Sequence, residues 1–376
     1  MRYRRFGKTN LLLSVFSLGT MRCLASMENA RKTVESAIAN GVNHLETARG
    51  YGKSEEYLGT ILRDDLSGLR SQLYITTKIP PTPHPDLMRQ WLDESLQRLQ
   101  VDYLDCLAIH GINTWEHLAW VESPHGCLKP IEEALADGKI KHLGFSTHAP
   151  LEVIIAAINT DLFQFVNLHY YYFFQHNLSA IELAHQKDMG IFIISPADKG
   201  GKLYNPPAKL EKLSYPFSPL ELNYRFLLSD SRITTLSFGP ANPDELLAPL
   251  ALANRDQPLN DREIEAFCVW ESQAKNKLGT DRCSQCYKCL PCPENINIPE
   301  VLRLRNLAVA YDMNDYGKYR YQMFENAGHW FPGVKGNRCT NCSDCLPHCP
   351  EKLDIPRLLM DTHNRLNGSP RRRLWE

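Results

Sequence analysis

The 376-residue sequence has no apolar run of membrane-spanning length, and its formal net charge is only −1. A hydrocarbon core needs about 20 consecutive apolar residues, so we expect a soluble protein. The balanced charge gives no reason to predict nucleic-acid or membrane partners. The sequence also lacks a GxGxxG segment after an expected strand, which disfavours a doubly wound dinucleotide fold.

The N-terminal segment lacks most features of a secretory leader. Its apolar stretch, 11–21, is interrupted by Ser14, Ser17 and Gly19, and no small-x-small cleavage site fits cleanly. We interpret this stretch as a folded first strand and expect a cytoplasmic protein. Disulfides are rare in that compartment, so the cysteines need another explanation.

Cysteine is abundant and clustered near the C-terminus. Eight of the twelve cysteines form two runs, each ending in Cys-Pro: Cys283, Cys286, Cys289 and Cys292, then Cys339, Cys342, Cys345 and Cys349. A CxxCxxC series with a later Cys-Pro is typical of cubic iron-sulfur clusters. The sequence therefore predicts two 4Fe-4S clusters in a ferredoxin-like arrangement.

In two-cluster ferredoxins the fourth cysteine of each run binds the other cluster. That rule pairs Cys349 with the first three cysteines of the first run, and Cys292 with the first three of the second. Structural zinc is an alternative, although zinc ribbons usually separate two CxxC pairs by a longer loop.

The rest of the chain alternates short β-branched runs with amphipathic stretches, which is typical of a parallel sheet covered by helices. Eight strands are expected, at 15–20, 44–48, 73–79, 103–110, 142–147, 163–169, 191–195 and 234–238. Helices are expected between them, for example at 30–40, 54–62, 86–99, 150–158, 180–187, 219–228 and 244–252. Eight such units predict an α/β fold of the TIM (β/α)8 barrel type, with 1–13 as a hairpin that closes its floor.

A further helix is expected at 261–277, capped by Asp261. We place the barrel in residues 1–275 and a small, mostly α-helical iron-sulfur domain in residues 276–376. In that domain Ile298-Pro299 and Ile355-Pro356 follow the two cysteine runs, and proline suits the first turn of a helix.

Active residues of such barrels lie at the C-terminal ends of the strands. Reading those ends gives Glu46 with nearby Tyr51, then Lys78, then His110. Each has a structural explanation when taken alone: loop packing for Tyr51, an ion pair for Glu46 and Lys78, and core packing for His110. Their placement at consecutive strand ends favours a joint role.

The segments that carry these residues resemble the aldo-keto reductase family: Asn43-His44-Leu45-Glu46-Thr47-Ala48-Arg49-Gly50-Tyr51-Gly52, Ile75-Thr76-Thr77-Lys78, Leu107-Ala108-Ile109-His110 and Leu143-Gly144-Phe145-Ser146. A later segment from Phe238 to Leu246 adds to the likeness. The whole chain looks like the branch of that family with a C-terminal iron-sulfur extension. The resemblance implies an oxidoreductase that moves hydride between NADP or NAD and a small carbonyl or alcohol substrate.

The resemblance also implies roles for individual residues. Tyr51 would be the general acid, with its pKa lowered by Lys78; His110 would orient the carbonyl, and Glu46 would hold Lys78. The expected cofactor-binding residues are Gly19, Thr20, Met21, Ser146, Thr147, Asn167, Ser195, Gly200, Gly239, Asn242 and Glu245.

Several residues depart from the family pattern, among them Asn167 in place of a glutamine, Ile194 in place of an aromatic ring, and two acids. Glu46 stands where the family has aspartate, and Glu245 aligns where many members have an arginine for the 2′-phosphate, so preference for NADPH is in doubt. Two other functions stay open. One is an iron-sulfur electron-transfer protein coupled to a ferredoxin-like carrier. The other is a non-catalytic barrel that senses nicotinamide or redox state.

Overall fold

The computed structural model describes residues 1–370, which form two compact units. The first contains Met1–Gly200 and Asn223–Pro258, and the second contains Gly201–Leu222 and residues 259–370. Residues 371–376, which the predicted C-terminal domain includes, lie outside the described residues.

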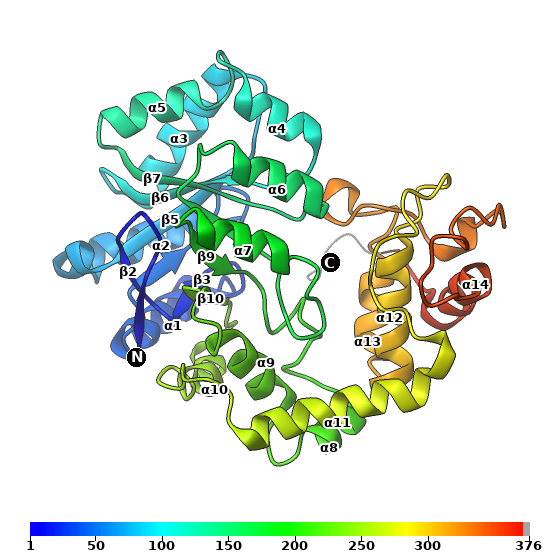
Figure 1. The fold of residues 1–376 in the computed structure, drawn as a ribbon. Coiled ribbons are helices and arrows are strands. Elements are labelled where there is room, and N and C mark those ends of the chain that lie inside the picture. The colour runs from blue at the N-terminus through cyan, green and yellow to red at the C-terminus, as the bar shows by residue number, and fades with distance from the viewer. Residues whose placement is uncertain (371–376) are drawn as a thin grey trace. The chain divides into compact units, whose positions relative to one another are not determined.

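The first unit contains a closed barrel of parallel strands (Figure 1). Neighbouring strands follow the order β10-β3-β4-β5-β6-β7-β8-β9, and β10 pairs with both β3 and β9 to close it. The strands are β3 (Phe16–Gly19), β4 (His44–Glu46), β5 (Tyr74–Ile79), β6 (Leu104–His110), β7 (Ile140–Ser146), β8 (Phe165–Leu168), β9 (Gly190–Ile193) and β10 (Thr235–Phe238). The predicted eight-stranded α/β barrel is confirmed.

The helices that follow the strands also agree with the sequence pattern in most places. They are α1 (Met27–Ala39), α2 (Ser54–Asp64), α3 (Pro85–Leu99), α6 (Leu151–Asn159), α7 (Leu178–Gln186) and α9 (Pro219–Leu228). Two shorter helices, α4 (Trp115–Glu122) and α5 (Lys129–Ala136), lie between β6 and β7 and were not among those predicted. A 3-10 helix, η1 (Ser67–Gln72), follows α2.

The helix predicted at 244–252 is wrong as one continuous element. A 3-10 turn, η2 (Pro243–Leu246), leads into the four-residue α10 (Leu247–Leu250). Pro249 explains the interruption, because it lacks the N–H that would bond to the carbonyl of Glu245.

An N-terminal hairpin lies before the barrel, as predicted. Strand β1 (Tyr3–Arg5) pairs antiparallel with β2 (Leu12–Ser14), and Phe6 in the connection is almost fully buried. The Phe6 ring centroid lies 5.1 Å from that of Phe165, the first residue of β8. A Cβ at Gly190, the first residue of β9, would lie 2.3 Å from the Phe6 ring. Phe6 therefore fills the N-terminal end of the barrel, opposite the end where catalytic residues are expected.

The second unit is helical. It contains α8 (Ala208–Ser214), α11 (Asp261–Leu278), α12 (Ile298–Tyr311), α13 (Asn314–Tyr321) and α14 (Ile355–Leu366), with 3-10 turns η3 (Gly279–Asp281), η4 (Gly328–Trp330) and η5 (Gly336–Arg338). Figure 1 shows α12, α13 and α14 together, and α12 packs against both of the others. Pro299 and Pro356 occupy the first turns of α12 and α14, as their Ile-Pro pairs predict.

The cap predicted for α11 is wrong by one residue. Asn260, not Asp261, caps the helix, and its side chain accepts from the Glu263 backbone N–H at 3.0 Å. The Glu263 carboxylate accepts in return from the Asn260 N–H at 2.9 Å, which completes a capping box. Asp261 becomes the first helical residue, where its charge still suits the helix N-terminus.

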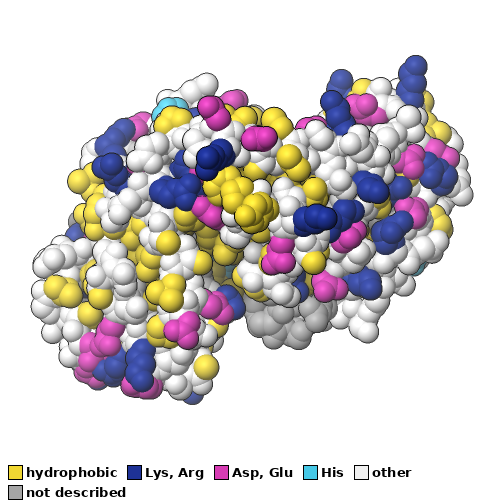
Figure 2. All heavy atoms as spheres, turned by 90° about the horizontal axis from the view of Figure 1, so that it is seen from below, with side chains coloured by type: hydrophobic (Ala, Val, Ile, Leu, Met, Phe, Trp, Pro, Cys, Tyr) yellow, Lys and Arg dark blue, Asp and Glu magenta, His cyan; other side chains and the backbone are white. Residues whose placement is uncertain are grey.

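The face of the molecule in Figure 2 carries basic and acidic side chains interspersed among each other. This agrees with the near-zero net charge of the whole sequence. None of the helices within residues 1–370 combines the length and apolar composition needed to cross a membrane.

Candidate functional site

Four side chains predicted to act together lie at the C-terminal ends of adjacent strands. Glu46 is the last residue of β4, Lys78 lies near the end of β5, and His110 is the last residue of β6. Tyr51 lies in the turn between β4 and α2. Because the strands are parallel and neighbours in the barrel, their ends bring these residues to one mouth.

Lys78 is the centre of the group. Its side chain is 2% exposed and its Nζ lies 2.6 Å from Glu46 Oε1. The same Nζ donates to the Thr47 carbonyl at 2.8 Å and to Tyr51 Oη at 3.2 Å. An ammonium has three hydrogens and no lone pair, so three acceptors satisfy it. Tyr51 is therefore the acceptor in its contact with Lys78, and its own O–H hydrogen is directed elsewhere.

Burial and neighbouring charges shift the pKa values of Lys78 and Tyr51. Burial acting alone would lower the pKa of Lys78, but Glu46 and Tyr51 offset this effect, and the pKa is raised. Burial raises the pKa of Tyr51, Lys78 opposes that rise, and Glu46 adds to it. Lys78 by itself lowers the pKa of Tyr51, as expected. The effect of burial is larger, so the pKa of Tyr51 is raised overall. Tyr51 is a neutral phenol beside a protonated amine.

His110 faces the phenol ring. The ring centroids of Tyr51 and His110 are 5.8 Å apart and the rings are nearly perpendicular, at 86°. Both side chains are half-buried, whereas Glu46 and Lys78 beneath them are buried. The phenol and the imidazole thus form the accessible part of the group, and the ion pair supports it from below.

Asn167 lies next to this ion pair. It is fully buried in β8, and its Nδ2 donates to Glu46 Oε1 at 3.5 Å. Its Oδ1 is one of the few buried polar side-chain atoms in residues 1–370 that has no hydrogen-bond partner. Such an acceptor is costly to leave unpaired, and an N–H donor from a bound molecule would satisfy it. The adjacent Ser146 Oγ, at the end of β7, accepts from the Gly111 N–H at 3.2 Å.

The other predicted cofactor residues near β3 and β7 lie at the end of each strand or just after it. Gly19 ends β3 in a narrow place, where a Cβ would lie 3.0 Å from Ser237 Oγ. The hydroxyl of Thr20 contacts the Ser54 hydroxyl at 2.6 Å, and that of Thr147 donates to the Ile112 carbonyl at 2.8 Å. These two threonines hold their loops in place. Met21 follows Thr20 and is partly exposed.

The loops after β9 and β10 contain the remaining predicted residues. Ser195 has a φ of +54°. The loop then folds back on itself, so a Cβ at Gly200 would lie 2.0 Å from the Pro196 carbonyl oxygen. Asn242 caps η2 by accepting from the N–H groups of Asp244 and Glu245.

Glu245 forms an ion pair with an arginine from another loop. Its carboxylate lies 2.9 Å from Arg22 Nη1, which also donates to the Gly239 carbonyl at 2.8 Å. The Ala241 N–H donates to the same carboxylate at 3.0 Å. Arg22 thereby joins the loop after β3 to the loop after β10. No local sequence pattern indicates this role for Arg22, because its partner is more than 200 residues away.

A second set of contacts at the barrel mouth was also missed. His148 Nδ1 lies 3.2 Å from His169 Nε2, and His169 Nδ1 contacts the Tyr171 hydroxyl. Tyr171 donates to the carbonyl of Ile194. These residues follow β7, β8 and β9, so the same strand-end reading that found Lys78 and His110 could have found them.

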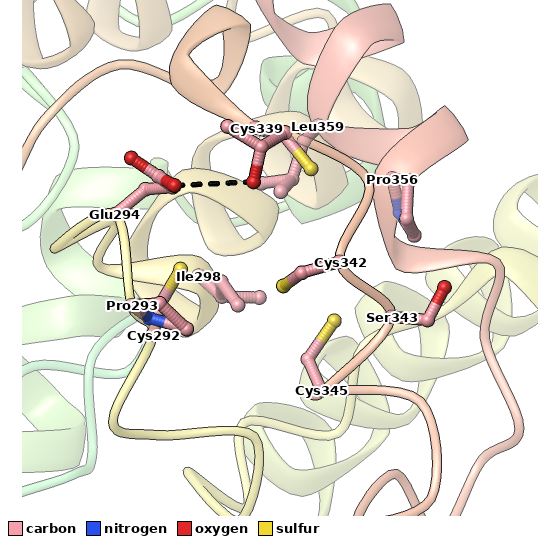
Figure 3. Close-up of a pocket in the computed structure, with 11 residues that line it drawn as sticks. Cys292, Pro293, Glu294, Ile298, Cys339, Cys342, Ser343, Cys345, Pro356 and Leu359 are labelled. Atoms are coloured by element: carbon pink, nitrogen blue, oxygen red, sulfur yellow. Dashed lines mark hydrogen bonds between the residues drawn. The ribbon is translucent and has the colours of Figure 1, made fainter.

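In the second unit the structure brings the cysteines together in two sets. One cavity, with about 300 Å³ of space partly open to solvent, is lined by Cys283, Cys286, Cys289 and Cys349. The other, about 340 Å³, is lined by Cys292, Cys339, Cys342 and Cys345. Figure 3 shows these last four cysteines around one open space. These are the two sets expected if the fourth cysteine of each run joins the first three cysteines of the other run.

The cysteines surround these cavities without converging on one point. Within residues 1–370, no three or more His, Cys, Asp or Glu side chains form a group that could hold a metal ion. All twelve cysteines are free of disulfides. Cys23, Cys106 and Cys127 are buried in the first unit, away from the two runs in sequence.

The fold and the barrel mouth define a class: a parallel (β/α)8 barrel with a tyrosine, a lysine, an acid and a histidine at the C-terminal ends of its strands. A profile of the Aldo/keto reductase family matches residues 16–205, half of the chain. The chain belongs to this family.

Curated relatives agree with this membership, and a solved structure shares the fold. The chain is 29% identical over 174 residues to 6-dehydroglucose reductase of Novosphingobium aromaticivorans, covering 42% of this chain and 54% of that protein. It is 28% identical over 166 residues to L-glyceraldehyde 3-phosphate reductase of Escherichia coli, covering 40% and 46%. The chain thus spans about half the length of these curated relatives. A solved aldo-keto reductase from Bacillus halodurans has the same fold, with a TM-score of 0.62 at 20% identity over 71% of this chain and 95% of that one.

Proposed function

We propose that the barrel is a nicotinamide-dependent oxidoreductase that reduces aldehydes or ketones, or oxidises alcohols. The observation that carries this proposal is the arrangement of three acceptors around the Lys78 ammonium. Its three N–H groups are used by Glu46, Thr47 and Tyr51, so the phenol keeps its own proton for another acceptor. A substrate carbonyl oxygen between Tyr51 and His110 is that acceptor.

Reduced nicotinamide supplies the hydride when it is bound. Tyr51 donates its proton to the carbonyl oxygen while the carbonyl carbon accepts the hydride, so the C=O π bond breaks and an alcohol forms. Lys78, whose Nζ lies 3.2 Å from the phenol oxygen in this structure, stabilises the tyrosinate charge until solvent returns the proton. Glu46 holds Lys78 in position, and His110 orients the carbonyl.

The residues present fit a nicotinamide. Its carboxamide has N–H donors, and Asn167 Oδ1 is a buried acceptor without a partner beside Ser146. Gly19, Thr20, Met21 and Thr147 are proposed to line the rest of the ring site. The loops with Ser195, Gly200, Gly239, Asn242 and Glu245 are proposed to hold the phosphates and adenosine, as expected beyond the last two barrel strands.

The choice between NADH and NADPH is proposed to depend on Glu245. Its carboxylate is compensated by Arg22, so a ribose with free hydroxyls meets an acceptor that is already held in place. A 2′-phosphate would compete with Glu245 for Arg22. We therefore expect NADH to be used at least as well as NADPH.

The test is oxidation of NADH and NADPH across a panel of aldehydes and ketones with Tyr51→Phe. General acid catalysis is worth about 10²–10⁴-fold, so the variant should lose activity by that factor. Tyr57→Phe, in the following helix, is the matched control and should keep full activity. Equal rates for Tyr51→Phe and the unmodified protein would refute the assignment.

We also propose that residues 276–376 bind two 4Fe-4S clusters, one in each cysteine-lined cavity. A cubic cluster places its four thiolate ligands around a volume, whereas a single zinc ion draws them to one point. Four cysteines line each cavity, of about 300 and 340 Å³, which is the number of thiolates that one cubic cluster takes. Anaerobic purification should give about eight irons and eight sulfides per chain. Stoichiometric zinc without iron would overturn this proposal.

Electron exchange with a ferredoxin-like carrier is a second candidate function for this unit. It is favoured by the solvent exposure of Cys286 and Cys342, one in each set, which would leave both clusters near the surface. Reduced clusters that are reoxidised by a low-potential carrier would support it. Clusters that no carrier or substrate reoxidises would indicate a structural role.

A further inference from the structure

The two cysteine runs have matching backbone conformations. Gln285 has a φ of +61° and Asn341 a φ of +59°, each two residues after the first cysteine of its run. Tyr287 and Ser343, two positions further on, have φ values of +60° and +69°. Side chains at corresponding positions of the runs can therefore be compared directly.

Gln285 donates a hydrogen bond to a cysteine sulfur. Its Nε2 lies 3.4 Å from Cys283 Sγ and 3.0 Å from the carbonyl oxygen of Pro299, in the first turn of α12. The two hydrogens of the amide thus have separate acceptors. The Pro299 carbonyl holds the amide so that its other N–H faces the sulfur.

The corresponding contact in the second run has the opposite polarity. Asn341 is one methylene shorter, and its Oδ1 lies 4.0 Å from Cys339 Sγ. A thiolate has no proton to donate to that oxygen, so this contact does not stabilise negative charge on sulfur. The two runs share a loop conformation. Of these two contacts, only that of Gln285 directs a side-chain N–H at a cysteine sulfur.

We propose that Gln285 raises the reduction potential of the cluster held by Cys283, Cys286, Cys289 and Cys349. This inference rests on the proposed presence of the clusters. One-electron reduction places additional negative charge on the cluster and its sulfur ligands, and an N–H donor stabilises that charge. Asn341 presents its Oδ1, and not an N–H, to Cys339, so we expect no equivalent stabilisation of the other cluster.

Reciprocal substitutions test the proposal in the full chain purified anaerobically. Gln285→Asn suits the left-handed backbone and withdraws the donor, and Asn341→Gln extends the side chain at the matching position. Dithionite titration followed by electron paramagnetic resonance measures both clusters. We expect Gln285→Asn to weaken reduction of one cluster about tenfold, which is about 59 mV for one electron, without moving the other. Asn341→Gln should strengthen reduction of the cluster that Gln285→Asn does not move.

Gln285→Glu provides a second variant of the same length. Its carboxylate replaces the donor by a charge, so reduction of the same cluster should weaken further. Unchanged potentials in Gln285→Asn and Gln285→Glu, with eight irons still bound, would overturn the role of Gln285. A chain that binds no iron would instead overturn the proposed clusters, so the two failures are distinguishable.

Discussion

The buried pair of Glu46 and Lys78 supports a quantitative prediction. Their side chains are 4% and 2% exposed and the charged atoms are 2.6 Å apart. Removing one partner of a buried pair usually costs about 3–5 kcal/mol, because it leaves the other charge uncompensated. Glu46→Gln leaves Lys78 with Thr47 and Tyr51 as acceptors, so its cost should lie near the lower value. Lys78→Met leaves Glu46 with a 3.5 Å contact from Asn167, so its cost should lie near the higher one.

The double variant Glu46→Gln/Lys78→Met contains neither charge. Replacing both partners of a buried pair is often close to neutral, so we expect a loss of about 1–2 kcal/mol. The sum of the single losses, about 8 kcal/mol, should therefore exceed the double loss by about 6 kcal/mol. Urea unfolding, monitored by circular dichroism at a single pH and with equal iron content in every sample, measures the free energy of unfolding. The unmodified protein, the two single variants and the double variant are compared. Additivity within about 0.5 kcal/mol would show that the two residues do not form a coupled buried pair, and the reasoning would fail.

Two further predictions concern the barrel core. Burial, together with the charge of Lys78, lowers the pKa of His44 from 6.5 to about 3. The unfolded chain therefore binds one more proton between these values, and the stability that neutral His44 contributes above pH 6.5 is lost as the pH falls towards 3, by about 1.4 kcal/mol per pH unit. Urea unfolding of His44→Asn should show a shallower pH dependence; the same slope as the unmodified protein would contradict the assignment. Gly144→Ala places a Cβ 2.5 Å from the Phe165 ring and should cost about 1–3 kcal/mol, whereas Gly68→Ala, with no neighbour within 4 Å, should change stability by less than about 0.5 kcal/mol. Equal unfolding midpoints for the two alanine variants would show that the Phe165 contact is not restrictive.

The barrel was predictable because its signals are local. Each strand is a short β-branched run and most helices have a continuous amphipathic pattern, so the order of elements can be read along the chain. The prediction failed where a local detail decided the outcome. Pro249 interrupts the helix expected at 244–252, and Asn260 rather than Asp261 caps α11 because its side chain completes a capping box with Glu263.

The site was predictable only as a set of candidates. Strand ends gave Glu46, Lys78 and His110, because parallel strands place those ends at one mouth. The Thr47 carbonyl as the third acceptor of Lys78, and the unpaired Oδ1 of Asn167, depend on the positions of single atoms. No residue pattern contains that information.

The sequence by itself determined which cysteines form runs and which strands alternate with helices, because both depend on spacing along the chain. Tertiary structure decided which atoms meet. It joined Arg22 to Glu245, placed Phe6 against Phe165 at the barrel floor, and gave Cys283 an N–H donor that Cys339 does not receive from Asn341. The physical reason is that residue spacing constrains only contacts within a turn or a strand. Contacts between residues far apart in the sequence depend on how the whole chain packs.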